Sequence, residues 1–296
     1  MKPQLCLGTA QFGLAYGITN ALGQVSESEV AQILQRAHQA GIYWLDTAQA
    51  YGNAEAVLGR QLPNEHTFKL VSKLPLNQQN EFTIRDVNLW EHAFHESCER
   101  LGQFVLDALL LHSIADLKKP GGHYLHEWLL GLRERGLVQR LGVSIYAASD
   151  LDGIESSLLD HVQLPLSLFD QRLLHDGTVA RLRDQGIAVH ARSVYLQGLL
   201  VTPAAYWPSW INAEARAHQE ALEVMAQERG CELLDLALGF VQEQGDLEAV
   251  VMGVCSVHQL EQLLASWSAR SPWQEGEWRT WALQEPSILD PRCWPR

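Results

Sequence analysis

Four polar side chains able to do acid–base chemistry follow short apolar runs in the sequence: Asp46, Tyr51, Lys73 and His112. Each run has the length of a buried strand, so three strands would supply all four groups. A phenol has an ordinary pKa of about 10, and a cation beside it stabilises the phenolate. Lys73 would be that cation, held by the Asp46 carboxylate, and His112 would donate a hydrogen bond to a carbonyl oxygen. The set could therefore protonate an oxygen on which negative charge develops, as hydride reduction of a carbonyl requires.

Each of these residues taken alone has a simpler explanation. Asp46 could cap the next turn, Lys73 could be solvated at a strand end, and His112 could be a core histidine bonded to the backbone. The carboxyl ends of neighbouring strands converge at one mouth of a parallel barrel. Because acid–base side chains are expected at four such positions, a shared site is the favoured interpretation.

Strand-like and helix-like patterns alternate along the chain without a linker or a shift in composition. Strands are expected at 4–9, 42–46, 68–73, 107–112, 138–144, 161–164, 187–192 and 249–252. One helix is expected to begin at the cap Ser26, with Glu29 three residues on, and to end at Gly41. Further helices are expected at 53–62, 84–101, 123–135, 147–157, 175–185, 213–229, 233–244 and 257–267. Eight such units predict an α/β fold, a single-domain (β/α)8 TIM barrel over residues 1–296. An open doubly wound sheet is the alternative, but residues 8–13 lack the G-x-G-x-x-G spacing of its dinucleotide site.

Composition narrows the class of protein further. The 296 residues carry 22 Lys plus Arg against 35 Asp plus Glu, a net charge of -13, and no basic run. A nucleic-acid or membrane partner is therefore not expected. Five scattered cysteines without C-x-x-C spacing predict neither a disulfide framework nor a metal site. The sequence shows neither a signal-peptide pattern nor an apolar run of about 18 residues, so a cytoplasmic location is expected. The oligomeric state stays open.

The segment Asp46-Thr-Ala-x-x-x-Tyr51-Gly-x-x-Glu-x-x-Leu-Gly resembles the signature of the aldo-keto reductases. Asp46, Tyr51, Lys73 and His112 match the family's catalytic tetrad, and the resemblance, closest to bacterial members, extends over nearly the whole expected barrel. It implies a nicotinamide cofactor, NADP(H) more than NAD(H), bound extended over the barrel mouth. It also implies hydride transfer to a small aldehyde or ketone, with Tyr51 as general acid.

The resemblance assigns further residues to the cofactor. Ser144 and Gln163 match the contacts to the nicotinamide carboxamide. The other matched positions lie in the first strand, after the seventh strand and at the adenosine end: Gly8, Thr9, Arg192, Ser193, Gln197, Gly198, Gly253, Ser256 and Gln259.

Four positions depart from the family pattern. Ile145 replaces an Asn beside the carboxamide, and Leu263 replaces an Asn that contacts adenine. Arg192 stands where an aromatic ring usually stacks on the nicotinamide; its flat guanidinium can also stack, and its charge would favour an anionic substrate. Gly253 and Gln259 stand where a Lys or Arg often holds the 2′-phosphate, which leaves the choice between NADPH and NADH open.

Other functions remain open at this stage. A nucleotide-binding regulatory or sensor barrel with little turnover is the main alternative. A barrel isomerase or aldolase using Lys73 as a Schiff-base amine is a third, although Asp46 would keep that amine charged. The tail 270–296 contains four tryptophans; packing against the barrel is expected, and an exposed partner-binding strip is the alternative.

Overall fold

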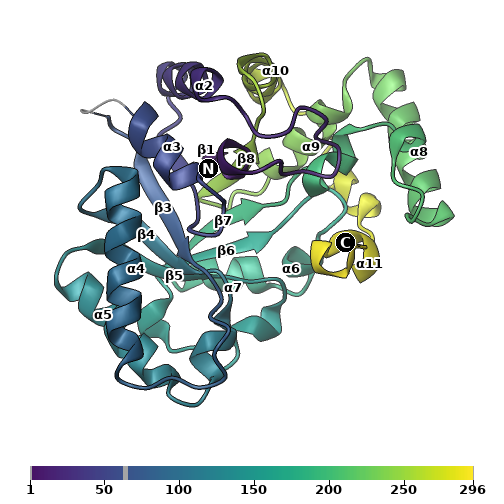
Figure 1. The fold of residues 1–296 in the computed structure, drawn as a ribbon. Helices are drawn as coiled ribbons and strands as arrows, with labels where there is room; N and C mark the ends of the chain where they lie inside the picture. Colours follow the sequence, from purple (N-terminus) through teal and green to yellow (C-terminus); the bar gives the residue numbers. More distant parts are fainter. Residues whose placement is uncertain (1, 63–65, 296) are drawn as a thin grey trace.

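Eight parallel strands close into a barrel in chain order in the computed structural model of the protein, which describes residues 2–62 and 66–295 (Figure 1). The strands are β1 (Gln4–Gly8), β2 (Trp44–Asp46), β3 (Lys69–Leu74), β4 (Leu106–Leu111), β5 (Val138–Ser144), β6 (His161–Pro165), β7 (Ala188–Arg192) and β8 (Ala249–Gly253). The barrel closes where β1 pairs with β8, with Gly8 opposite Gly253. The (β/α)8 prediction is confirmed, and every strand lies within two residues of its expected bounds.

Helices follow the strands around the outside of the barrel. They are α1 (Ala10–Gly13), α2 (Glu27–Gln39), α3 (Ala54–Gln61), α4 (Asp86–Leu101), α5 (Gly122–Glu134), α6 (Arg172–His175), α7 (Thr178–Asp184), α8 (Ala213–Arg229), α9 (Leu233–Gln242), α10 (Val257–Ser268) and α11 (Pro286–Leu289). Local signals fix most of the long ones. In α8, the Asn212 side chain accepts a hydrogen bond from the Ala215 amide, and Gly230, with a φ of 62°, ends the helix.

One helix prediction is wrong, and a second helix begins later than expected. The expected helix at 147–157 is replaced by two short 3-10 turns, η2 (Ala148–Leu151) and η3 (Ser156–Leu158). Gly153 has a φ of 76° between them, and the Asp150 side chain accepts from two loop amides. The helix expected at 175–185 is present as α7, but it begins at Thr178, because Gly177, whose φ is 77°, separates it from the short helix α6. Left-handed glycines end helices, so both interruptions have a local backbone cause.

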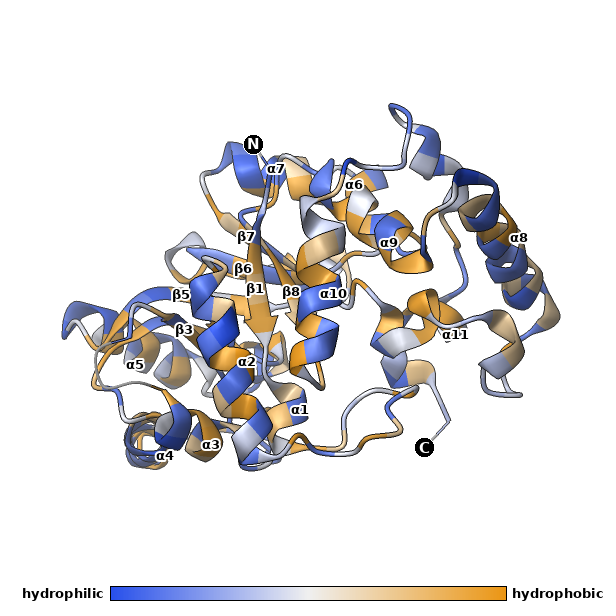
Figure 2. Ribbon diagram, turned by 90° about the horizontal axis from the view of Figure 1, so that it is seen from above, coloured by the Kyte–Doolittle hydropathy of each residue, from blue (hydrophilic) through white to orange (hydrophobic). Residues whose placement is uncertain are grey.

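Apolar side chains are buried in two places: inside the barrel, and between the strands and the helices that surround them. Strands β1 and β8 are largely hydrophobic, while α2, α4 and α10 alternate polar and apolar residues around their axes (Figure 2). A small cluster fills the barrel interior and contains Cys6, Trp44, Val71, Ala108, Leu110 and Ala249. The rings of His161 and His190 also lie inside, with centroids 4.0 Å apart. The interior is thus packed with side chains, and binding space lies at the carboxyl ends of the strands.

The C-terminal tail packs onto the helical layer. Trp273, Trp278, Trp281 and Trp294 are each at most 9% exposed. The Trp273 indole donates to the carbonyl of Leu236 in α9 at 2.8 Å. The last turn of the tail, η7 (Pro291–Cys293), brings Arg292 to the barrel mouth. These rings lie inside the protein surface, so they do not form an exposed strip. No helix within residues 2–62 and 66–295 has the length and apolar character needed to cross a bilayer.

Candidate active site

A buried ion pair joins the ends of β2 and β3. The Lys73 Nζ donates to both Asp46 carboxylate oxygens, at 2.6 and 2.7 Å, and to the Thr47 carbonyl at 3.0 Å. Burial alone would lower the pKa of Lys73, but the adjacent Asp46 carboxylate outweighs it and raises that pKa above its ordinary value. The Lys73 side chain is therefore a fixed cation, unlike the neutral amine that Schiff-base chemistry needs.

Tyr51 and His112 lie beside this pair. The Lys73 Nζ is 5.1 Å from the centre of the Tyr51 ring, and the His112 ring stands edge-on to Tyr51 at 5.9 Å. Burial raises the pKa of Tyr51, and the charge of Lys73 opposes that effect without overcoming it. Burial, with Lys73 and Arg192 nearby, lowers the pKa of His112 to about 4. At neutral pH the site therefore contains a protonated phenol and an uncharged imidazole.

Other residues of the sequence motif hold the helix that follows Tyr51. In α3, the buried Glu55 accepts from Ser72 on β3 at 2.7 Å, and from Ser97 and Arg100 on α4 at 2.5 and 2.8 Å. A Cβ on Gly59 would lie 2.0 Å from the Arg100 carbonyl oxygen, so only glycine allows α3 to pack this closely on α4. Part of the motif is thus structural, and it fixes the segment from which Tyr51 projects.

Gln163 connects the ion pair to the groove above it. Its side-chain amide donates to Asp46 Oδ1 at 2.7 Å. Its carbonyl oxygen Oε1 is buried and has no hydrogen-bond partner among residues 2–62 and 66–295. A buried acceptor left in this state costs free energy unless a ligand satisfies it. Gln163 is therefore oriented to accept a hydrogen bond from a donor in the groove.

A cavity of about 1430 Å³ opens over these groups. It exceeds the roughly 300–1,000 Å³ of most small-molecule sites, which leaves room for a long ligand and a second molecule. Most residues expected from the sequence line it, and these are Gly8, Thr9, Asp46, Tyr51, His112, Ser144, Gln163, Arg192, Ser193, Gln197, Gly198, Gly253 and Gln259. Lys73 lies buried beneath the lining. Ser256 is not a lining residue; its hydroxyl accepts from the Gln259 amide and caps α10.

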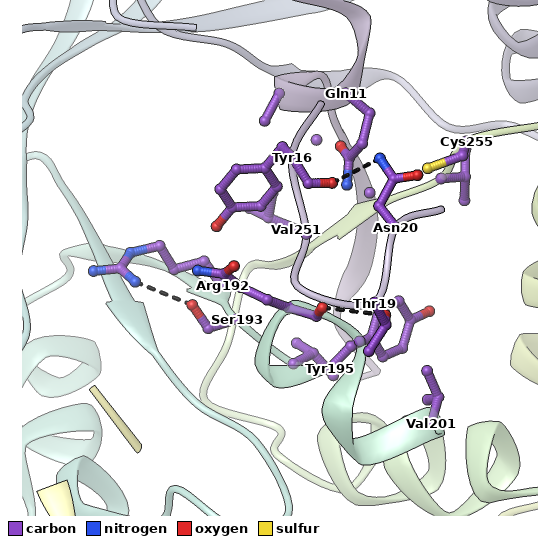
Figure 3. Close-up of a pocket in the computed structure, with 18 of the residues that line it drawn as sticks. Gln11, Tyr16, Thr19, Asn20, Arg192, Ser193, Tyr195, Val201, Val251 and Cys255 are labelled. Atoms are coloured by element: carbon purple, nitrogen blue, oxygen red, sulfur yellow. Dashed lines mark hydrogen bonds between the residues drawn. The ribbon is translucent and has the colours of Figure 1, made fainter. Parts of the chain in front are cut away.

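The loop after β7 is strained where it meets the groove. Ser193, Leu196 and Gln197 have φ values of 61°, 47° and 55°, in the left-handed region. Such residues cost about 1–3 kcal/mol each and cluster at binding sites. Thr19, from the loop after α1, approaches this segment and donates to the Gln197 carbonyl at 3.4 Å (Figure 3). The two loops touch where both line the groove.

Tyr146 lies between two arginines at the mouth of the groove, which the sequence did not indicate. The guanidinium carbons of Arg192 and Arg292 lie 4.2 and 3.8 Å from its ring centre. Arg192 also donates to Ser144, Ser193 and the Ile145 carbonyl. Arg292 is paired with Asp290 at 2.6 Å, whereas Arg192 forms no ion pair with a carboxylate in the described part of the chain. Arg192 thus stacks on Tyr146, which the sequence did not suggest, and its charge has no carboxylate partner in the described residues.

The groove suits a nicotinamide dinucleotide in chemistry as well as size. The unpartnered Gln163 Oε1 can accept from a carboxamide N–H, and the Ser144 hydroxyl lines the same wall. Ile145 offers no polar side chain here, as the sequence indicated; its carbonyl is already bonded to Arg192 at 3.0 Å. The residues of the nicotinamide end therefore fit the group with one side-chain contact fewer than the family pattern.

A parallel barrel with acid–base groups at its carboxyl end defines a TIM-barrel enzyme site. The model of the aldo/keto reductase family matches residues 4–281, and the chain belongs to this family. Aldo-keto reductases use nicotinamide cofactors, and the residues of the groove fit such a group.

Several known proteins are similar to the chain. An aldo-keto reductase of Mycolicibacterium vanbaalenii is 34% identical over 140 residues, which cover 45% of this chain and 46% of that protein. The chain thus spans about half the length of this relative. The D-arabinose 1-dehydrogenase of Saccharomyces cerevisiae is 26% identical over 255 residues, covering 77% and 73%. Among solved structures, an aldo-keto reductase of Bacillus halodurans in holo form has a TM-score of 0.74 at 19% identity, covering 98% of this chain and 95% of that one. A glycerol dehydrogenase of Gluconobacter oxydans has a TM-score of 0.70 at 20% identity, covering 94% and 89%.

Proposed function

We propose that this protein reduces an aldehyde or ketone to an alcohol with NAD(P)H, using Tyr51 as the general acid. One observation carries the proposal: a protonated phenol faces the groove with the Lys73 ammonium 5.1 Å from its ring centre and the His112 ring at 5.9 Å. In this setting, His112 can donate a hydrogen bond to the carbonyl oxygen, and the Lys73 ammonium can stabilise the negative charge left on Tyr51 after proton transfer.

When bound, the cofactor supplies a hydride to the carbonyl carbon. The protein's residues handle the oxygen. His112 is uncharged because its pKa is about 4, so one ring nitrogen can donate a hydrogen bond that orients the carbonyl. Tyr51 transfers its proton to the oxygen as negative charge develops there. Lys73 stabilises the resulting phenolate, and Asp46 keeps Lys73 charged and in place.

We further propose that the substrate carries a negative charge. Arg192 lines the groove near Tyr51 and His112, and its charge acts on the pKa of both. It lacks a carboxylate partner in the described residues, so an anionic group on the substrate would compensate a half-buried cation.

The test is a tryptophan-fluorescence titration with each nucleotide, followed by turnover of a panel of aldehydes and ketones. Tyr51→Phe should bind nucleotide as the wild type does, because the ring is retained. Its turnover should fall by about 10²–10⁴-fold, the usual contribution of a general acid. Tyr43→Phe, an exposed tyrosine before β2, serves as the matched control and should change neither quantity.

Retained turnover in Tyr51→Phe would reject the mechanism. Tight nucleotide binding by the wild type without measurable turnover of any carbonyl compound would favour the regulatory or sensor barrel instead.

A further inference from the structure

Arg192 lies at the carboxyl end of β7, the strand next to the one that carries Gln163. Its Nε donates to the Ser144 hydroxyl at 3.3 Å, and Ser144 is the register partner of Gln163. The buried Gln163 Oε1, which accepts no hydrogen bond from the described residues, fits a carboxamide N–H. All three side chains line the same groove. A nicotinamide held by Gln163 therefore has the Arg192 guanidinium in the adjoining part of the wall.

Neutral groups hold this guanidinium in place. Besides Ser144, its acceptors are the Ser193 hydroxyl at 3.1 Å and the Ile145 carbonyl at 3.0 Å; the bond to Ser193 is drawn in Figure 3. The Tyr146 ring stacks on it at 4.2 Å. None of these groups is negatively charged, so they fix the position of the charge without cancelling it.

The other cations at this end of the groove have carboxylate partners. Lys73 is paired with Asp46 at 2.6 Å, and Arg292 is paired with Asp290 at 2.6 Å. Arg192 has no such partner within residues 2–62 and 66–295. A charge that forms in this part of the groove therefore interacts with an uncompensated positive charge at a fixed position.

The nicotinamide ring changes its charge with its redox state. The ring is uncharged in NADH and NADPH, and it carries a positive charge in NAD⁺ and NADP⁺, because a hydride has left it. The adenosine and phosphate groups are the same in both forms. A cation beside the ring therefore disfavours the oxidised form alone. An aromatic side chain at position 192, as in the family pattern, would have the opposite effect, since an aromatic face attracts a cation.

We propose that Arg192 makes the protein bind the reduced nicotinamide cofactor more tightly than the oxidised one. The same charge connects the cofactor with the substrate. An anionic group that pairs with Arg192 compensates its charge, so an anionic carbonyl compound also lowers the cost of forming the positive ring. The proposal rests on the proposed function, because it assumes that the nicotinamide lies at Gln163.

The experiment measures Kd for NADH, NAD⁺, NADPH and NADP⁺ by tryptophan fluorescence and calorimetry. The ratio of the oxidised to the reduced Kd removes the contribution of the adenosine and phosphate groups, which both forms share. Arg192→Met keeps the length of the side chain and removes its charge. The ratio should fall about 10-fold in this variant, the effect of one charge interaction in a partly exposed site. Binding of ADP-ribose, which lacks nicotinamide, should not change.

Two further variants separate charge from stacking. Arg192→Lys keeps a positive charge but loses the flat guanidinium, and it should keep most of the wild-type ratio. Arg292→Met is the matched control, because Arg292 stacks on the same Tyr146 ring but is neutralised by Asp290; it should change the ratio little. The wild type supplies a test without any substitution. Its ratio should fall between about 0.1 M and about 1 M NaCl, because salt screens the charge.

Each outcome decides between the two proposals. An unchanged ratio in Arg192→Met, with turnover of carbonyl compounds retained, would overturn the role of Arg192 and leave the reductase intact. Equal losses in Arg192→Met and Arg192→Lys would assign the preference to stacking and reject charge as its cause. If Arg192→Met does not fold, a wild-type ratio that is insensitive to salt would overturn the proposal. Binding of none of the four dinucleotides would instead remove the proposed function.

Discussion

Gln163 on β6 donates a hydrogen bond to Asp46 on β2, at 2.7 Å and from the opposite side of the eight-stranded barrel. The Gln163 carbonyl oxygen at the end of this side chain is buried and accepts no hydrogen bond from the residues that the structure describes. One side chain therefore connects the ion pair behind Tyr51 with the wall expected to hold the nicotinamide. The residues proposed for catalysis and for cofactor binding are therefore parts of one hydrogen-bonded unit.

Replacing Gln163 should weaken binding of the nicotinamide part alone. Gln163→Met keeps the length of the side chain and removes its acceptor. NADH affinity should fall about 10-fold, the value of one buried hydrogen bond to a ligand. Binding of ADP-ribose, which lacks nicotinamide, should not change. Equal losses for both ligands in the fluorescence titration would show that Gln163 does not face the nicotinamide.

The Lys73–Asp46 pair should dominate the local stability of the mouth. Lys73→Met leaves Asp46 as a buried carboxylate without its cation, so the free energy of unfolding should fall by about 3–5 kcal/mol. Adding Asp46→Asn to this variant should recover part of the loss. Arg60→Met, which breaks an exposed ion pair with Glu27, should change stability little. Urea denaturation measures all three, and a Lys73 effect no larger than the Arg60 effect would contradict the prediction.

The low pKa of His112 should make stability depend on pH in a defined window. The unfolded chain protonates this residue near its ordinary pKa of 6.5, and the folded chain only near 4. The unfolded state therefore binds more protons between these values, so stability falls as pH drops from 6.5 to 4, by about 3 kcal/mol. His112→Gln cannot titrate and should lose that much less stability between pH 7 and pH 4. Parallel pH profiles for the two proteins in urea denaturation would contradict this.

Arg192 should discriminate between charged and neutral substrates. In Arg192→Met, kcat/KM for 4-carboxybenzaldehyde should fall about 10–100-fold relative to 4-methylbenzaldehyde, because a charge-assisted contact of about 1.5–3 kcal/mol is lost. Arg292→Met is the matched control, since Arg292 stacks on the same Tyr146 ring but is neutralised by Asp290. An equal effect of the two substitutions would argue for stacking, and against charge, as the function of Arg192.

Local signals were enough for most of the fold. Each strand is a short buried run, and α8 has a polar cap and a final glycine, so its bounds are as expected. The helix expected at 147–157 failed because its apolar spacing was weak and Gly153 interrupts it. Ser256 was assigned to the cofactor although Ser256 and Gln259 have the spacing of a helix cap, and the Ser256 hydroxyl does cap α10.

The parts of the site that could not be predicted from the sequence are contacts between segments far apart in the chain. The tetrad could be assembled from strand ends because a barrel brings those ends together. The stack of Arg192, Tyr146 and Arg292 joins β7, the loop after β5 and the last turn of the chain. The bond from Thr19 to Gln197 joins the loops after α1 and β7. Neither contact has a periodicity or spacing that identifies it in one sequence.

The contact between Thr19 and Gln197 has a consequence for exchange kinetics. The loops carrying these residues both line the groove and touch each other through this one exposed hydrogen bond. One hydrogen bond of 3.4 Å contributes only about 1 kcal/mol, which adds little to equilibrium affinity. If a nucleotide binds beneath this contact, the hydrogen bond would have to open before the spent nucleotide leaves. The residence time of the oxidised cofactor would then follow loop motion, and turnover would be limited by its release.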